Sequence, residues 1–317
     1  MLALTKAGSS VALATVPDPV PLSHEAIVRV NTFCLNRREL LDLAKLPDGS
    51  VPGSDFAGTL REYPAVIGDT AKLRAVQGAR VVGTVRQGAW AELVAVPYTR
   101  LAGIPHNVAD VQASTLPTAG LAALRSLEIG GFLIGKRVLV TGARGDVGRL
   151  TCQLAHLAGA HVTAFVRPEE RAPRSYRPLD QVPGADLVTE HLPGRFDLVI
   201  DTVGGEILGE AIEWLEPQGV LVAVATPELD GRVSFRTWRA DHSAGVRIQF
   251  LDEFDEVTAH DRIHTDLMRL LELVSTFKLD VGVGLEEPWQ NAPEVIQAVL
   301  DGRITGRAVL RVRTVGL

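Results

Sequence analysis

Short apolar runs separated by turn residues dominate the first third of the chain. Three of them, at residues 25–30, 80–85 and 91–96, are rich in Val, Ile and Ala and are bounded by Pro- and Gly-bearing segments. Such runs are typical of β-strands. The pattern therefore predicts a mostly β region over residues 1–115.

From about residue 117 to 250 the pattern changes to alternating strands and helices. Strands are predicted at 138–140, 161–166, 196–203 and 219–225. Apolar residues at helical spacing follow two of these strands: Val147, Leu150, Leu154, Leu157 and Ala158, then Ile207, Leu208, Ala211, Ile212 and Leu215. This alternation predicts a parallel sheet. The tail adds helices at about 262–276 and 291–301 and a last strand at 307–312.

The strand at 138–140 runs into a glycine-rich turn that ends at Gly148. Strand, turn, helix and the strand at 161–166 make a βαβ unit, whose turn lets a pyrophosphate reach backbone N–H groups at the helix start. The alternative is an ordinary corner whose glycines serve packing alone. We favour a dinucleotide site, with these predicted cofactor-binding residues: Thr141, Gly142, Ala143, Arg144, Gly145, Asp146, Val147, Gly148, Arg167, Val203, Gly204 and Ala225.

Two positions in the turn depart from the dinucleotide fingerprint. Ala143 stands where the first glycine is expected, and Asp146 adds a carboxylate. That carboxylate would either repel phosphate or cap the start of the helix, where Asp is common. We favour the cap.

Cofactor choice depends on the end of the second strand of the unit. An acidic residue there favours NAD, whereas Arg favours the 2′-phosphate of NADP. This chain has Arg167 at that place, with Arg171 and Arg174 nearby. The alternative is that Arg167 is a solvated surface cation, and we favour NADPH. Four prolines between 168 and 183 predict a short or broken helix and a mobile loop near the adenosine end of the cofactor.

Composition bounds the class of protein. The chain has 317 residues, 46% apolar and 22% charged, which suggests two folded domains. A net charge of −6 argues against nucleic acid as a partner. No apolar run reaches the roughly 20 residues of a membrane span, and the start of the chain lacks signal-peptide features. Cys34 and Cys152 make no disulfide framework. We expect a cytoplasmic protein with reduced thiols and no membrane partner.

Several segments together resemble one family, the medium-chain dehydrogenase/reductases, in the zinc-independent quinone oxidoreductase and enoyl reductase branch. They follow in the family's order: VNTFCLNRREL at 30–40, VPGSDFAG at 51–58, GAWAE at 88–92, LPTAGLAAL at 116–124, the glycine turn, DTVGG at 201–205 and GRITGRAVL at 302–310. The resemblance implies an α/β protein. A GroES-like β-rich catalytic domain would span 1–116 and 251–317, and a doubly wound Rossmann domain would span 117–250. It also implies a homodimer and a substrate site between the domains.

Zinc is not expected. A structural zinc commonly takes four Cys, and a catalytic zinc takes three ligands from Cys, His and carboxylates. The chain has two Cys, and it has Asn36 and Ser54 where zinc-dependent relatives place Cys and His.

The resemblance implies hydride transfer from NADPH to a quinone or an α,β-unsaturated carbonyl compound, both small molecules. No tyrosine proton donor is visible near Asn36, so Asn36, Arg37 or water would act on the substrate oxygen; Asn36 could also serve only its turn. Ala122 stands where the family motif has a Thr that reaches the cofactor. Asp146 and Ala122 favour the alternative, a binding or scaffold protein or a redox-neutral enzyme of secondary metabolism. The intact glycines favour the reductase.

We predict that NADPH binds more tightly than NADH because of Arg167. A charge-assisted contact to the 2′-phosphate is worth about 1.5–3 kcal/mol. Fluorescence titration of both cofactors should show this preference in the wild type and its loss in Arg167→Ala. Equal affinities in the wild type would contradict the prediction.

Overall fold

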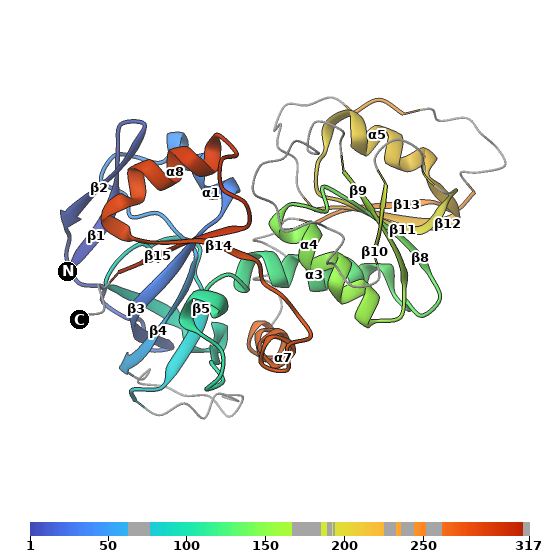
Figure 1. Ribbon diagram of the computed structural model, residues 1–317. Coiled ribbons are helices and arrows are strands. Elements are labelled where there is room, and N and C mark those ends of the chain that lie inside the picture. The colour runs from blue at the N-terminus through green and yellow to red at the C-terminus, as the bar shows by residue number, and fades with distance from the viewer. Residues whose placement is uncertain are drawn as a thin grey trace. The chain divides into compact units, whose positions relative to one another are not determined.

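The computed structural model describes residues 1–62, 77–166, 185–188, 192, 194–224, 233–235, 244–251 and 262–312. The chain divides into two compact units (Figure 1). The N-terminal unit comprises residues 1–121 and 260–317, and the second unit comprises residues 122–259. Arg167, Ala225 and the proline-rich segment after Arg167 lie outside the described residues, so the predictions made for them stay predictions.

The N-terminal unit is built mainly of strands. Its elements are β1 (Leu2–Ala7), β2 (Ser10–Thr15), β3 (Glu25–Leu35), α1 (Arg37–Asp42), η1 (Leu43–Lys45), β4 (Asp55–Glu62), β5 (Arg80–Thr84), β6 (Leu93–Pro97), η2 (Tyr98–Arg100), β7 (Leu101–Gly103), α2 (Asp110–Ala113), α7 (Ile263–Ser275), β14 (Val283–Pro288), η5 (Trp289–Asn291), α8 (Ala292–Leu300) and β15 (Arg307–Arg311). Helix α3 (Pro117–Gly130) crosses the division between the units.

The end of the chain joins the sheet formed by its beginning. The sheet has the order β14-β15-β3-β4-β5-β7, and β6 also pairs with β3. Strand β15 is antiparallel to β3, with Ala308 opposite Leu35 and Leu310 opposite Phe33. Strand β14 is parallel to β15. The GroES-like unit is therefore assembled from both ends of the sequence.

An aromatic cluster fills the core of this unit and explains one motif glycine. The ring of Phe33 stacks on Trp90 at 5.7 Å between centroids and meets the edge of Trp289 at 6.5 Å. Gly53 has a φ of +93°, and a Cβ there would lie 2.0 Å from Cδ1 of Trp90. The backbone N–H of Trp90 also donates to the carbonyl of Pro52 at 3.1 Å. The motif segments at 51–58 and 88–92 therefore pack directly against each other.

The second unit is a parallel sheet with helices on both faces. Its elements are β8 (Arg137–Thr141), α4 (Asp146–Leu157), β9 (His161–Phe165), β10 (Ala185–Val188), β11 (Phe196–Asp201), α5 (Gly205–Glu213), β12 (Leu215–Ala223) and β13 (Arg247–Phe250). The strand order is β10-β9-β8-β11-β12-β13, and every pair is parallel. Figure 1 shows α5 above these strands and α4 below them.

This order is that of a doubly wound dinucleotide-binding fold. Successive strands are added on one side of β8 as far as β10, and the order then switches to the other side of β8, where β11 lies. The predicted fold class, a Rossmann sheet with a GroES-like β-rich domain, is confirmed. Within the described part of the chain, no helix has both the length and the apolar character needed to cross a membrane.

We predict that Gly53→Ala destabilises the protein more than Gly49→Ala. Both glycines have positive φ, +93° and +85°, so both variants carry backbone strain of about 1–2 kcal/mol. Only the Gly53 variant also meets the Trp90 ring, which adds about 1–3 kcal/mol of overpacking. Urea unfolding of the two variants should resolve the difference, and equal midpoints would contradict the packing role of Gly53.

Candidate active site

The glycine-rich turn joins β8 to α4 and exposes the start of the helix. Strand β8 ends at Thr141, and α4 begins at Asp146 with Gly145 as its N-cap. The N-cap has no side chain to accept a hydrogen bond from the first N–H groups of the helix. Since such groups have no partner within the helix, they are available to an anion at this end.

Two glycines of the turn are required by close packing. Gly142 has a φ of +60°, and a Cβ on it would lie 2.4 Å from Oγ1 of Thr202. A Cβ on Gly148 would lie 2.4 Å from the carbonyl oxygen of Gly142. Ala143, which replaces the expected glycine, is fully buried within the turn, so the fold accommodates its methyl group.

The predicted N-cap at Asp146 is wrong. Gly145 occupies the cap position with extended backbone (φ −70°, ψ 167°), and Asp146 is the first helical residue. Its carboxylate lies in the first turn, where it interacts favourably with the helix dipole. Arg144 and Val147 are partly exposed beside it.

Asp201, at the end of β11, ties the turn to the next strand. This buried carboxylate accepts hydrogen bonds from Oγ1 of Thr141 at 2.5 Å and from the N–H groups of Val203 at 3.4 Å and Gly204 at 2.8 Å. The hydroxyl of Thr202 donates to the carbonyl of Thr141 at 2.8 Å. Asp201 therefore brings together three of the residues predicted to bind the cofactor: Thr141, Val203 and Gly204. Asp201 itself was not predicted as a site residue, and its role is to position these three.

A second constellation lies wholly within the N-terminal unit, and we call it the polar cluster. Its six members come from α1, β4, α3 and β15, together with the residue that precedes α1: Asn36, Glu39, Ser54, Asp55, Thr118 and Arg307. Four of them are at most 5% exposed, whereas Glu39 and Thr118 are partly exposed. A buried set of this polarity is retained only when its members satisfy one another.

Asp55 is the most fully satisfied member of the polar cluster. Its two oxygens accept the hydroxyl of Thr118 at 2.7 Å and the backbone N–H of Thr118 at 3.0 Å. Nδ2 of Asn36 donates to it at 3.2 Å, and the Arg307 guanidinium lies 3.9 Å away. These contacts compensate a carboxylate that has no exposed surface.

Asn36 is held in one orientation by Arg307. The guanidinium donates to Oδ1 of Asn36 at 2.7 Å, and a guanidinium has donors only. The amide NH2 group of Asn36 therefore faces Ser54, Asp55 and Glu39, at 3.3, 3.2 and 3.3 Å. The Ser54 hydroxyl donates to Oε1 of Glu39 in a short hydrogen bond.

Burial sets the protonation of the two carboxyls. Burial, followed by repulsion from Asp55, raises the pKa of Glu39 from 4.5 to about 7, against the lowering effect of its hydrogen bonds to Ser54 and Asn36. Burial also raises the pKa of Asp55, although Arg307 and Thr118 oppose this. Because Asp55 has the cation and the larger set of donors, we assign the negative charge to Asp55, and we assign the proton to Glu39 below about pH 7.

The two predicted catalytic residues have different surroundings. Asn36 belongs to the polar cluster. Arg37 is exposed, and its guanidinium donates to the carbonyl of Val299 at 3.5 Å. Four partners of Asn36 were not predicted from the sequence: Glu39, Asp55, Thr118 and Arg307. The motif at 51–58 was the available signal for Asp55.

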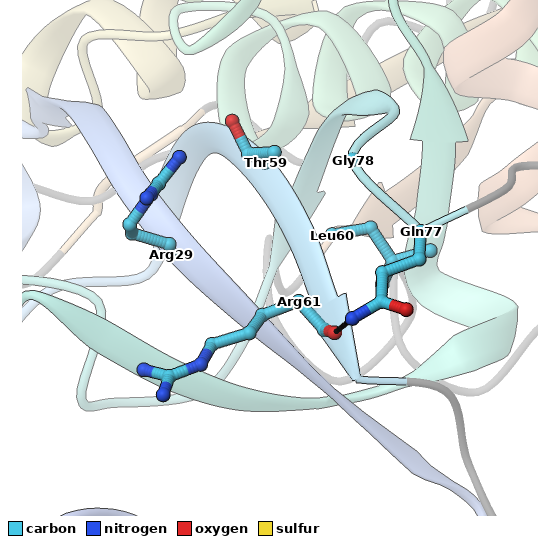
Figure 2. Close-up of a pocket in the computed structure, with 6 residues that line it drawn as sticks. All are labelled: Arg29, Thr59, Leu60, Arg61, Gln77 and Gly78. Carbon is cyan, nitrogen blue, oxygen red and sulfur yellow. Dashed lines mark hydrogen bonds between the residues drawn. The ribbon is translucent and has the colours of Figure 1, made fainter.

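A pocket of about 450 Å³ lies elsewhere in the N-terminal unit (Figure 2). It is lined by Arg29, Thr59, Leu60, Arg61, Gln77 and Gly78, and Nε2 of Gln77 donates to the carbonyl of Arg61 at 2.9 Å. Arg61 lies towards the end of β4, whereas Asp55 begins that strand. The pocket is thus separate from the polar cluster.

Comparisons with known proteins place the chain in a family. Residues 176–310 match the model of the zinc-binding dehydrogenase family. A 2-methylene-furan-3-one reductase from Solanum lycopersicum is 32% identical over 247 residues, which cover 70% of this chain and 60% of that protein. Erythronolide synthase EryA2 from Saccharopolyspora erythraea is 28% identical over 95% of this chain, which spans 8% of the synthase.

A solved structure, mycobacterial Rv1454c complexed with NADPH, superposes with a TM-score of 0.82 at 22% identity, covering 98% of this chain and 100% of that one. The chain belongs to the medium-chain dehydrogenase/reductase superfamily. The chain spans only part of the length of both of these curated relatives.

The polar cluster of this superfamily member does not fit zinc. Among the described residues, no three His, Cys, Asp or Glu side chains gather closely enough to hold a metal. The amide NH2 group of Asn36, which has no lone pair to give, faces the carboxylates, and Arg307 already supplies a cation beside Asp55. Zinc prefers sulfur, imidazole and carboxylate ligands.

We predict that the wild type loses stability relative to Glu39→Gln as pH rises from about 4.5 to 7. In that window the folded protein holds the Glu39 proton more tightly than the unfolded chain, so folding is progressively opposed as the proton is removed. Above pH 7 the full penalty, about 1–2 kcal/mol for a partly exposed side chain, should be present. Urea unfolding across pH 4.5–8 measures the difference, and a pH-independent difference would contradict the assignment.

Proposed function

We propose that this protein is an NADPH-dependent reductase of α,β-unsaturated carbonyl compounds or quinones that works without zinc. The observation that carries the proposal is the glycine turn at 141–148, set at the reversal point of a parallel sheet with dinucleotide-binding order. The 2-methylene-furan-3-one reductase among its relatives supports an activated alkene as the substrate. Quinones share the chemistry, since both present a carbon–carbon double bond conjugated to a carbonyl.

The cofactor would be held mainly by backbone. The turn residues offer N–H groups at the start of α4, and Val203 and Gly204, positioned by Asp201, offer backbone at the adjacent strand end. Arg167 would contact the 2′-phosphate and Ala225 would complete the site. When bound, NADPH supplies the hydride.

The chain's own side chains would bind and polarise the substrate carbonyl. Arg37 is exposed at the start of α1 and has donors to offer a substrate oxygen. The amide of Asn36 is shared among three acceptors in the polar cluster, so its role would be to hold those groups in place. A guanidinium remains charged at any ordinary pH, so Arg37 would bind the oxygen without supplying a proton.

The second candidate, a family member without redox turnover, is supported by Asp146 and Ala122. Asp146 places a negative charge in the first turn of α4, where the cofactor's phosphates would lie. Ala122 is buried in α3 and lacks the hydroxyl of the family motif. We weigh these below the intact packing of Gly142 and Gly148, which preserves the turn.

We also infer a homodimer. Strand β13 is the edge of the parallel sheet, and all four of its residues are exposed, including Ile248 and Phe250. An exposed apolar edge strand is an aggregation hazard unless another chain pairs with it. Pairing of β13 with the β13 of a second copy would cover it.

We predict that the protein oxidises NADPH when mixed with a small enone or quinone and not with the corresponding saturated ketone. Gly148→Ala should weaken NADPH binding at least about tenfold, because its Cβ would push the turn out of shape, a cost of about 1–3 kcal/mol. Gly131→Ala in the same unit is the control: its φ of +78° brings backbone strain, but its Cβ meets nothing within 4 Å and the residue lies outside the turn. NADPH fluorescence and absorbance measure binding and turnover.

Absence of NADPH oxidation with every enone and quinone, alongside tight NADPH binding, would support the second candidate. Equal NADPH affinity in the two glycine variants would contradict the role given to the turn.

A further inference from the structure

The Glu39 carboxyl has one oxygen that is fully engaged and one that is not. Oε1 accepts hydrogen bonds from the Ser54 hydroxyl and from Nδ2 of Asn36. Oε2 is buried and has no hydrogen-bond partner among the described residues. A buried carboxylate oxygen without a donor costs free energy, so the favoured state is the neutral acid with its proton on Oε2. That O–H then lacks an acceptor.

The neighbours of Glu39 explain why this carboxyl, rather than Asp55, keeps the proton. Both carboxyls share the amide of Asn36, so two negative charges would repel across it. Asp55 has the Arg307 guanidinium at 3.9 Å and two hydrogen bonds from Thr118. Glu39 has neither a cation nor a donor for Oε2 in the described part of the chain.

Apart from Asp55, to which we assign the negative charge because Arg307 and Thr118 stabilise it, no other member of the polar cluster can release a proton near neutral pH. Arg307 stays charged, the Asn36 amide does not titrate, and the hydroxyls of Ser54 and Thr118 are very weak acids. The Thr118 hydroxyl is also committed to Asp55 at 2.7 Å. Glu39 is partly exposed as a residue, but its Oε2 atom is buried. The proposal below therefore requires the carboxyl end group to rotate towards a ligand oxygen, about a torsion that has a broad energy minimum.

We propose that Glu39 is a catalytic acid whose Oε2 hydroxyl donates to the carbonyl oxygen of the unsaturated substrate and then gives up its proton there. This inference rests on the proposed reductase function. The hydride that NADPH would supply, from the C4–H bond of its nicotinamide, forms a C–H bond at the β-carbon, and the π electrons of the double bond move towards the carbonyl oxygen. The Oε2–H bond of Glu39 breaks, leaving a carboxylate, and the proton bonds to that oxygen. The resulting enol becomes the saturated carbonyl as its O–H proton is exchanged for a C–H bond at the α-carbon, and one proton taken up from the solvent restores the neutral Glu39 carboxyl.

The kinetic test compares Glu39→Gln with Glu62→Gln, an exposed glutamate on β4 that serves as the matched control. Gln keeps the size of Glu39 but has no acidic proton. Expected for Glu39→Gln is a loss of kcat of at least about 100-fold with an enone, with NADPH affinity within about twofold of wild type. Wild-type kcat should fall above about pH 7, whereas the residual rate of Glu39→Gln should be flat there. Glu62→Gln should match the wild type in both respects. A Glu39→Gln rate within about threefold of the wild type would overturn the proposal.

A second readout needs no turnover. Infrared difference spectra should show the carbonyl stretch of a protonated carboxyl that titrates near pH 7 in the wild type and disappears in Glu39→Gln. Adding an enone without NADPH should shift this band, because the O–H gains an acceptor. A band that does not shift when enone is added would mean that the Oε2 hydroxyl forms no hydrogen bond to the substrate. This result would overturn the proposal even if the enzyme proves to be a reductase. If no substrate is turned over, the reductase proposal fails while this spectrum still decides the role of Glu39.

Discussion

The buried charge of Asp55 is the constraint on which the N-terminal unit depends. Taking a carboxylate fully out of water costs several kcal/mol unless it is paired and hydrogen-bonded. The compensation comes from distant parts of the sequence, from Thr118 at the start of α3 and from Arg307 at the start of β15. The return of the last strand to β3 therefore completes both the sheet and the electrostatic balance of the polar cluster.

A similar device organises the second unit. Asp201 is also buried at a strand end, and it gathers Thr141, Val203 and Gly204 around the glycine turn. In each unit a buried aspartate fixes the backbone and side chains that face the proposed chemistry. The two units differ in the surroundings of the buried aspartate. Asp201 accepts hydrogen bonds from three residues. Asp55 instead shares the Asn36 amide with a second carboxyl, that of Glu39, and the pair of carboxyls keeps one proton.

Local pattern was enough to predict most of the second unit. The helices at 146–157 and 205–213 and the strands around them follow from apolar periodicity and from glycines at their ends, and their predicted bounds differ from the observed ones by a few residues. Strand β12 begins at Leu215, earlier than predicted, because Leu215 pairs with Phe196 across the sheet, which is a tertiary contact. Asp146 was given the wrong role because the sequence cannot say whether Gly145 or Asp146 has the extended backbone of an N-cap.

The polar cluster could be predicted only in part. Asn36 and Ser54 were visible as the residues that stand where zinc-dependent relatives place ligands, but nothing local indicates that Arg307, far along the chain, would orient the Asn36 amide. The role of Glu39 was likewise hidden, because its protonation depends on which of its two oxygens finds a donor. Such properties arise from packing between distant segments and have no periodic signature.

The central claim, reduction of an activated double bond by hydride from NADPH, is tested most directly with NADPH deuterated at the transferable position of the nicotinamide C4. The wild-type protein is incubated with this cofactor and an enone, and the product is examined by mass spectrometry and NMR. The account predicts one deuterium at the β-carbon of a saturated carbonyl product. Cofactor that binds tightly while the enone is recovered unchanged and free of deuterium would contradict it.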